Sequence, residues 1–112
     1  MRHIAILDIG KTNKKCFVFD EDYRIAFEKS TQLPETADED GYPCEDLVLL
    51  RHWVLDTVRE VLDDPRFQIQ AINCTAYGAS LVHLDAAGNP IAPLYNYLKP
   101  FPEALKRQFF EQ

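Results

Sequence analysis

The chain has 112 residues, of which 46% are hydrophobic and 27% are charged, and its net charge at pH 7 is −6. These values are ordinary for one globular domain and exclude a disordered chain. The negative balance provides no field that attracts nucleic acid or an anionic membrane, and no apolar run approaches the length of a membrane span. We therefore expect a single domain over residues 1–112, with neither nucleic acid nor membrane as its partner.

The cysteines and the first residues of the sequence indicate the cellular compartment of the protein. Cys16, Cys44 and Cys74 lie far apart and form no CxxC pair. An odd number of cysteines without metal-ligand spacing is typical of reduced thiols in a cytosol. The chain begins with basic and then apolar residues, as a signal peptide does, but Asp8 ends the apolar run after four residues. The sequence therefore predicts a cytoplasmic location.

Three short segments rich in strand-forming residues open the chain, at residues 4–7, 16–19 and 24–29. The first two are continuous apolar runs, which are typical of buried strands. The third mixes apolar and polar residues, as an edge strand does. Residues 20–23 favour a turn because their carboxylates can accept hydrogen bonds from nearby backbone amides. We expect three consecutive antiparallel strands.

A helix follows a surface loop in the middle of the chain. Residues 31–44 are rich in proline, glycine and acidic residues, and they predict the loop. Over residues 45–62 apolar side chains recur at steps of three and four, which predicts an amphipathic helix with acids in its first turn. The helix should end before Pro65. Trp53 lies one step from the apolar stripe and is expected to pack.

Two more strands are expected after the helix, at residues 69–74 and 81–84, with a turn at 86–89 behind them. Residues 102–112 predict a terminal helix with Pro102 in its first turn. Because a helix joins the third strand to the fourth, these two connect by a crossover that permits parallel pairing. The sequence therefore predicts a mixed α/β sheet of about five strands.

Gly10-Lys11-Thr12 resembles the end of a P-loop, but the rest of that motif is missing. A P-loop needs a glycine five residues before Gly10, where Ala5 stands, and a helix after the threonine, where a strand is expected. No GxGxxG motif is present either. The alternative is a tight turn between two antiparallel strands. Gly10 permits close approach of the backbone to a ligand, and such turns present amides to phosphate oxygens.

Asp8 stands at the end of the first strand, beside the same turn. A carboxylate there is compatible with bound phosphates only if a cation bridges the two. The structural alternative is that Asp8 and Thr12 cap the turn through hydrogen bonds from side chain to backbone. Lys14 and Lys15 are interpreted as the solvated edge of the hairpin.

Two blocks of the sequence together resemble the beginning of the FGGY carbohydrate kinases, especially the rhamnulose and fuculose kinase branch. The first is DIGKTN from Asp8, followed by a strand that ends in Asp20. The second is TAYGASLVHLDAAGNPIAP from Thr75, which corresponds to an aromatic–glycine turn, a strand ending in Leu-Asp and a glycine turn. The resemblance spans nearly the whole chain. It implies a ribonuclease H-like sheet of the actin-like ATPase superfamily, present here as an incomplete N-terminal lobe.

The same resemblance implies ATP-dependent phosphorylation of a sugar hydroxyl, with ATP and Mg²⁺ as cofactors. Asp8 would hold Mg²⁺ through water. The residues facing the ATP phosphates would be Gly10, Lys11, Thr12 and Asn13, and those at the sugar pocket would be Tyr77, Gly78 and Ser80. Members of the rhamnulose type carry an acidic or amide residue near Ser80, and an Arg-Asp pair where this chain has Tyr97-Leu98-Lys99. These departures leave the sugar open.

In the family that the chain resembles, the catalytic base and the adenosine pocket come from later sequence. We therefore expect no catalytic base in this chain, no activity from it alone, and the remainder of a kinase chain as its partner. An uncovered sheet face would favour self-association. Other functions remain open, namely a non-catalytic α/β module or another actin-like ATPase.

Structural interpretations of single residues stand beside the functional ones. Tyr77 is as compatible with the core as with a pocket. Cys16 and Cys74 fall in strands and are expected to be small core residues. The three histidines do not lie at the spacing of metal ligands, so no metal site is predicted at His3, His52 or His83.

Overall fold

A computed structural model describes residues 1–111 and contains one four-stranded sheet, a two-stranded ladder and two helices. The elements in chain order are β1 (His3–Ile9), β2 (Lys14–Phe19), β3 (Ile25–Thr31), β4 (Thr36–Ala37), β5 (Pro43–Cys44), α1 (Leu47–Asp63), β6 (Ile69–Ala76) and α2 (Glu103–Phe110). The large sheet has the order β3-β2-β1-β6, and β4 pairs with β5 inside the predicted loop. No helix within residues 1–111 has the length and apolar character needed to cross a membrane.

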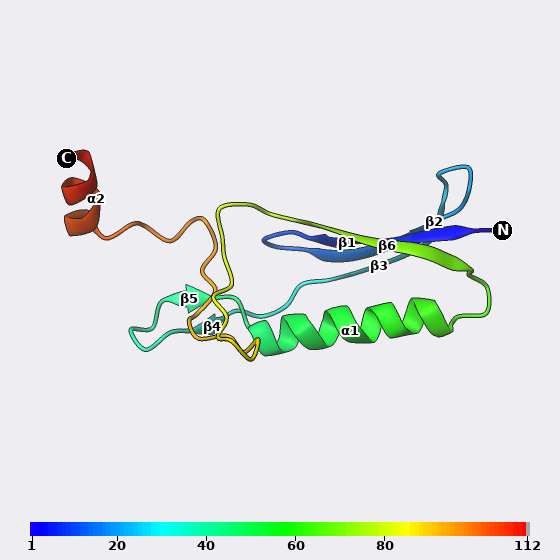
Figure 1. Cartoon of the computed structure of the whole chain (residues 1–112), viewed down its shortest axis with the longest axis horizontal. Helices are drawn as coiled ribbons and strands as arrows, with labels where there is room; N and C mark the ends of the chain where they lie inside the picture. Colours follow the sequence, from blue (N-terminus) through cyan, green and yellow to red (C-terminus); the bar gives the residue numbers. More distant parts are fainter. Residues whose placement is uncertain (112) are drawn as a thin grey trace.

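The strand directions confirm the predicted mixed sheet. β1 pairs antiparallel with β2, β2 pairs antiparallel with β3, and β6 returns parallel to β1. The connection from β3 to β6 includes α1, which lies along one face of the sheet (Figure 1). A parallel return requires such a crossover, because a short hairpin can join only antiparallel strands.

The ends of α1 follow from two residues. The side chain of Asp46 accepts hydrogen bonds from the amides of Val48 and Leu49, both at 3.1 Å, and so caps the N-terminus. At the other end, Asp64 is extended because it precedes Pro65, which disfavours helical backbone. The expected acids in the first turn are absent, since Asp46 is the cap and Glu45 lies before the helix.

The core lies between α1 and the face of the sheet that it covers. Side chains alternate between the two faces of a strand, so Ala5 and Leu7 of β1 lie beside Cys16 and Val18 of β2, and Val61 of α1 packs against them. A ring of half-buried apolar residues surrounds this cluster, namely Ile9, Phe27, Trp53, Val54, Val58, Phe67 and Ile69. The predicted packing of Trp53 and burial of Cys16 are therefore confirmed.

Two expectations for the second half of the chain are wrong. Residues 81–84 form no strand and make only one isolated bridge, between Leu84 and Pro90, so the large sheet has four strands instead of five. Cys74 is exposed. Cys74 lies on β6, which is an edge strand of the large sheet and is exposed at every position after Ile69. The turn at 86–89 is present, closed by the amide of Asp85 donating to the carbonyl of Asn89 at 2.9 Å.

The end of the chain extends away from the sheet (Figure 1). The molecule measures 58 × 28 × 26 Å, and α2 projects at one end of it. Pro102 precedes the first residue of α2 instead of lying within its first turn, and Gln112 of the predicted helix lies outside the described residues. The aromatic side chains of Phe101, Phe109 and Phe110 are exposed. The structure therefore leaves apolar surface uncovered, and self-association through it stays a prediction.

Valine-to-alanine substitutions on the two faces of α1 should differ in their effect on the free energy of unfolding. Val61→Ala should lower the free energy of unfolding by about 1.5–3 kcal/mol, because it opens a cavity in the buried cluster. Val48→Ala on the exposed face should change it by less than about 0.5 kcal/mol. Urea denaturation of the two variants measures both values, and equal losses would contradict the assignment of the core.

Candidate functional site

The turn between β1 and β2 is tight and depends on Gly10. Its amide donates to the carbonyl of Asn13 at 2.8 Å. A Cβ atom at Gly10 would lie 2.8 Å from the same carbonyl oxygen, closer than side chains tolerate, so no other residue fits without a shift of the turn. Strands precede and follow the turn. The structure thus has the predicted hairpin and not the strand-to-helix junction of a P-loop.

Three backbone amides of this turn are free to bind a ligand. Within residues 1–111, the amides of Lys11, Thr12 and Asn13 donate no hydrogen bond to another protein group. Successive unpaired amides in a turn form a concave site for anions. The amide of Gly10 is occupied by the Asn13 carbonyl, so Lys11, Thr12 and Asn13 are the residues of this turn with unpaired amides, and phosphate binding at Gly10 to Asn13 stays a prediction.

Asp8 lies beside the turn near the end of β1. It is half-buried and stands opposite Lys15 of β2 on one side and Thr75 of β6 on the other. Neither Asp8 nor Thr12 uses its side chain in a hydrogen bond within the described part of the chain, so the capping alternative lacks support.

The donor set around Asp8 suits only one kind of metal. Residues 1–111 contain no group of three His, Cys, Asp or Glu side chains that could hold an ion. Mg²⁺ keeps several waters and is commonly held by one or two carboxylates together with substrate phosphates. A single carboxylate beside a turn with unpaired amides fits such an ion and does not fit a metal held by protein alone.

Lys14 is buried, and the interpretation of this residue as a solvated edge is wrong. Its side chain is 1% exposed, and its Nζ lies 3.1 Å and 3.4 Å from the two carboxylate oxygens of Glu45. The same Nζ donates to the carbonyl of Lys11 at 3.0 Å. The alternation of β2 places Lys14 on the α1 side with Cys16 and Val18, which explains the burial. Lys15 has the opposite phase and is half-buried.

Glu45 joins the hairpin to two later segments. Its backbone amide donates to the carbonyl of Leu94 at 2.8 Å, and its Oε1 accepts from the hydroxyl of Tyr77 at 3.0 Å. The backbone amide of Tyr77 donates to the carbonyl of Ile9 at 3.0 Å. We refer to the three bonded side chains of Lys14, Glu45 and Tyr77 as the buried network.

The environment of Tyr77 disfavours its ionised form. Burial, and then the hydrogen bond to Glu45 and the negative charge of that carboxylate, raise the pKa of Tyr77 to about 12. The hydroxyl therefore stays protonated at neutral pH and remains a donor to Glu45.

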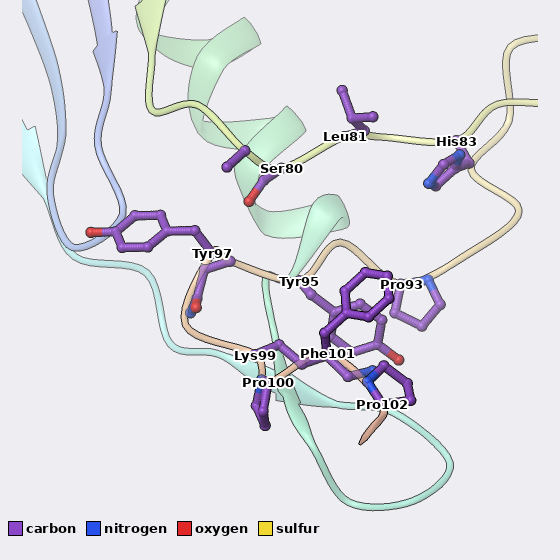
Figure 2. Close-up of a pocket in the computed structure, with 12 residues that line it drawn as sticks. Ser80, Leu81, His83, Pro93, Tyr95, Tyr97, Lys99, Pro100, Phe101 and Pro102 are labelled. Atoms are coloured by element: carbon purple, nitrogen blue, oxygen red, sulfur yellow. The ribbon is translucent and has the colours of Figure 1, made fainter. Parts of the chain in front are cut away.

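A cavity of about 470 Å³ lies next to Ser80, between residues 79–83 and the segment 93–102 (Figure 2). The polar groups that line it come from Ser80, His83, Asn96, Tyr97 and Lys99. The Oγ of Ser80 is buried and lies near the Tyr77 hydroxyl, whose pKa it lowers through a side-chain hydrogen bond. Ser80 therefore connects the wall of the cavity to Tyr77.

The backbone next to this cavity is strained. Ala79 has φ of +60°, a left-handed conformation that residues other than glycine rarely adopt. Such outliers cluster at binding sites, where the surrounding structure holds them in place.

The floor of the cavity is held by a second cluster. Asp38 accepts from the hydroxyl of Tyr95 at 2.5 Å and from the amide of Tyr42 at 2.8 Å. The Nζ of Lys99 lies 3.3 Å from the centroid of the Tyr95 ring and 4.0 Å from Asp38 Oδ2. The hydrogen bond from Tyr95, followed by that from the Tyr42 amide, lowers the pKa of Asp38. The cluster thus joins the β4–β5 ladder to the segment that carries Tyr97.

The structure divides the predicted site residues into two groups. Gly10 to Asn13 and Asp8 gather at the hairpin turn, whereas Ser80 lines the cavity. Tyr77 and Gly78 do not line that cavity, and the Tyr77 ring instead contacts the Tyr97 ring, with 6.1 Å between centroids.

Three residues around the candidate site were missed from sequence, namely Lys14, Glu45 and Asp38. The alternation of side chains along β2 indicates that Lys14 faces the core, since the residues two and four positions later, Cys16 and Val18, are core residues. For Glu45, and for the contact of Asp38 with Tyr95, no sequence signal exists, because those side-chain partners are more than 30 residues away.

No family model matches the chain, and no curated protein matches it. Solved structures do. A carbohydrate kinase from Novosphingobium aromaticivorans is similar with a TM-score of 0.80 and 24% identity, over 96% of this chain and 22% of that one. A xylulose kinase from Rhodospirillum rubrum is similar with a TM-score of 0.79 and 17% identity, over 99% of this chain and 24% of that one. A ligand-bound xylulose kinase from Lactobacillus acidophilus is similar with a TM-score of 0.72 and 20% identity, over 85% of this chain and 19% of that one.

These likenesses confirm the resemblance to carbohydrate kinases at the level of the fold. This chain spans about a fifth of the length of the structures that it matches. The mixed sheet, the crossover helix and the segments after β6 therefore form an arrangement that occurs in solved carbohydrate kinases.

Removing one partner of the buried ion pair should be far more costly than removing one partner of an exposed pair. Glu45→Ala leaves the Lys14 ammonium buried without a counter-charge and should lower the free energy of unfolding by about 3–5 kcal/mol. Glu60→Ala breaks the exposed pair with Lys29 and should cost about 1 kcal/mol or less. Chemical denaturation compares them, and similar losses would show that Lys14 is solvated.

The raised pKa of Tyr77 predicts a late ionisation in alkali. The folded protein holds this proton more tightly than the unfolded chain. Its contribution to stability is therefore complete below about pH 10 and is lost as pH rises through about 12. The pKa of Tyr95 is also raised to about 12, by its hydrogen bond to Asp38 first. Absorbance at 295 nm should show two late tyrosines, one of which disappears in Tyr77→Phe and both in Tyr77→Phe/Tyr95→Phe.

Proposed function

We propose that this chain is the N-terminal part of a carbohydrate kinase that transfers the γ-phosphoryl group of ATP to a sugar hydroxyl. The observation that carries the proposal is the hairpin turn, in which three free amides lie next to Asp8. Its support is the fold, since solved carbohydrate kinases contain the same arrangement of strands and helix. We place this fold in the ribonuclease H-like group of the actin-like ATPases.

Each part of the candidate site has a role in this reaction. The amides of Lys11, Thr12 and Asn13 bind phosphate oxygens of the nucleotide and stabilise their negative charge. Asp8 holds a hydrated Mg²⁺ ion, whose charge offsets that of the phosphates. Catalysis of phosphoryl transfer relies mainly on positioning and charge stabilisation, which are the functions that a rigid turn supplies.

The sugar belongs at the other group of residues. We assign Ser80 to the wall of its pocket, with Tyr77 and Gly78 in the strand-to-loop segment that leads to it. A serine hydroxyl can both donate to and accept from a sugar hydroxyl, and Ser80 lines the cavity.

The chain alone should not complete the reaction. A kinase of this type needs a group that accepts or orients the proton of the attacking hydroxyl. We assign no carboxylate of this chain to that role. Asp85 is engaged by the amides of Ala87 and Asn89 in a turn, and Asp38 is held by Tyr95. The remaining four fifths of the length of the similar kinases would supply the base and the nucleotide pocket.

The test is sugar-dependent release of ADP by the full-length protein, with a panel of ketoses and aldoses. Asp8→Asn removes the charge that holds the cation and keeps the shape of the side chain, so turnover should fall at least about 100-fold while the melting temperature stays nearly constant. The 112-residue chain should give no sugar-dependent ADP release.

Two results would contradict this proposal. If Asp8→Asn retained activity and lost thermal stability, Asp8 would be a structural residue of the hairpin. If the full-length protein bound neither nucleotide nor any sugar, the fold would serve a non-catalytic role.

A further inference from the structure

The buried network connects the interior of the protein to one peptide unit of the candidate phosphate-binding turn. Lys14 Nζ bonds the carbonyl of Lys11, which belongs to the same peptide unit as the amide of Thr12. The structure contains no cis peptide bond within residues 1–111. In a planar trans peptide, the carbonyl and the following amide point in opposite directions.

The consequence is a fixed direction for the Thr12 amide. The Lys14 ammonium lies in the interior, where its side chain is 1% exposed, and it holds the Lys11 carbonyl toward itself. The Thr12 amide must therefore point away from Lys14. No acceptor for it exists within the described residues, so it faces a ligand or solvent.

The rest of the network fixes Lys14 in turn. Both carboxylate oxygens of Glu45 lie within 3.4 Å of the ammonium, and the Tyr77 hydroxyl donates a hydrogen bond to Oε1 of the same carboxylate. Apolar side chains of similar volume at Lys14 and Glu45 would stabilise the fold as well or better, since a buried ion pair rarely recovers its desolvation cost. An apolar side chain at position 14, however, cannot bond the Lys11 carbonyl.

We propose that Lys14 is a positioning residue, held by Glu45 and Tyr77, that orients the Thr12 amide toward a nucleotide phosphate. The proposal rests on the proposed function in one respect, which is that the ligand of the turn is a nucleotide. Lys14 does not contact the phosphate and acts through the peptide unit between Lys11 and Thr12.

A spectroscopic experiment on the full-length protein tests this role. Threonine is labelled with ¹⁵N, and the Thr12 amide signal is assigned with Thr12→Ser. On titration with Mg²⁺ and the non-hydrolysable ATP analogue AMP-PNP, the Thr12 amide proton should shift downfield, as expected for a hydrogen bond to an anionic oxygen.

The key variant is Lys14→Met/Glu45→Leu/Tyr77→Phe, which replaces the whole network by apolar groups and so should remain folded. The downfield shift of the Thr12 signal should be lost, and affinity for Mg-AMP-PNP should fall about 10- to 100-fold, the range for one hydrogen bond to a charged group. The matched control is Lys29→Met/Glu60→Leu, which removes an exposed strand-to-helix ion pair and should change neither value.

The outcomes distinguish the positioning role of Lys14 from the proposed function. If the unmodified protein binds Mg-AMP-PNP and the folded triple variant keeps the Thr12 shift and the affinity, the network is structural only and the positioning role is overturned. If the unmodified protein does not bind Mg-AMP-PNP, the proposed function fails and the positioning role fails with it.

A milder variant covers the case in which the triple variant does not fold. Tyr77→Phe removes a single hydroxyl from Glu45 and should weaken Mg-AMP-PNP binding about threefold, the effect of a neutral hydrogen bond, with a proportionate loss of the Thr12 shift. An unchanged Thr12 shift in this variant would count against the proposal.

Discussion

The buried ion pair between Lys14 and Glu45 is the interaction on which the arrangement of this molecule depends. It joins the first hairpin to the residue that precedes α1, across 31 positions of sequence. Through the amide of Glu45 it also anchors Leu94, and through the Tyr77 hydroxyl it anchors the end of β6. Glu45 thus holds together the three segments that surround the candidate site, through its carboxylate to Lys14 and Tyr77 and through its backbone amide to Leu94. Its position inside the protein makes each of these contacts stronger than it would be in water.

The parallel pairing of β1 and β6 explains why the two groups of candidate residues lie at the same end of the sheet. Asp8 is the penultimate residue of β1, Gly10 follows that strand, and Tyr77 to Ser80 follow the end of β6. The carboxyl ends of parallel strands meet at one edge, which is where open α/β sheets bind ligands. The amide of Tyr77 donates to the carbonyl of Ile9, so the two loops leave the sheet in contact. A nucleotide at one loop and a sugar at the other would therefore approach each other.

Apolar residues remain exposed on the sheet face that α1 does not cover, on the edge strand β6 and on α2. Ile4 of β1 and Ile72 of β6 are each 41% exposed, and the aromatic residues of α2 are more exposed still. Apolar surface of this kind is typical of a part that packs against further protein. The similar kinases are about five times longer, which agrees with the proposal that more chain completes this lobe.

The local structure of this protein could be predicted from the sequence, because it depends on neighbouring residues. The apolar runs of β1 and β2, the periodicity of α1, the stop before Pro65 and the glycine turn at Gly10 were all predicted and are present. The ion pair of Lys14, the exposure of Cys74 and the irregular structure of residues 81–84 depend on tertiary contacts. Lys14 is buried because a carboxylate 31 residues away compensates its charge. Cys74 is exposed on the edge strand β6, and residues 81–84 pair with no strand of the large sheet. Burial and pairing are set by partners distant in the sequence, and composition and spacing do not encode those partners.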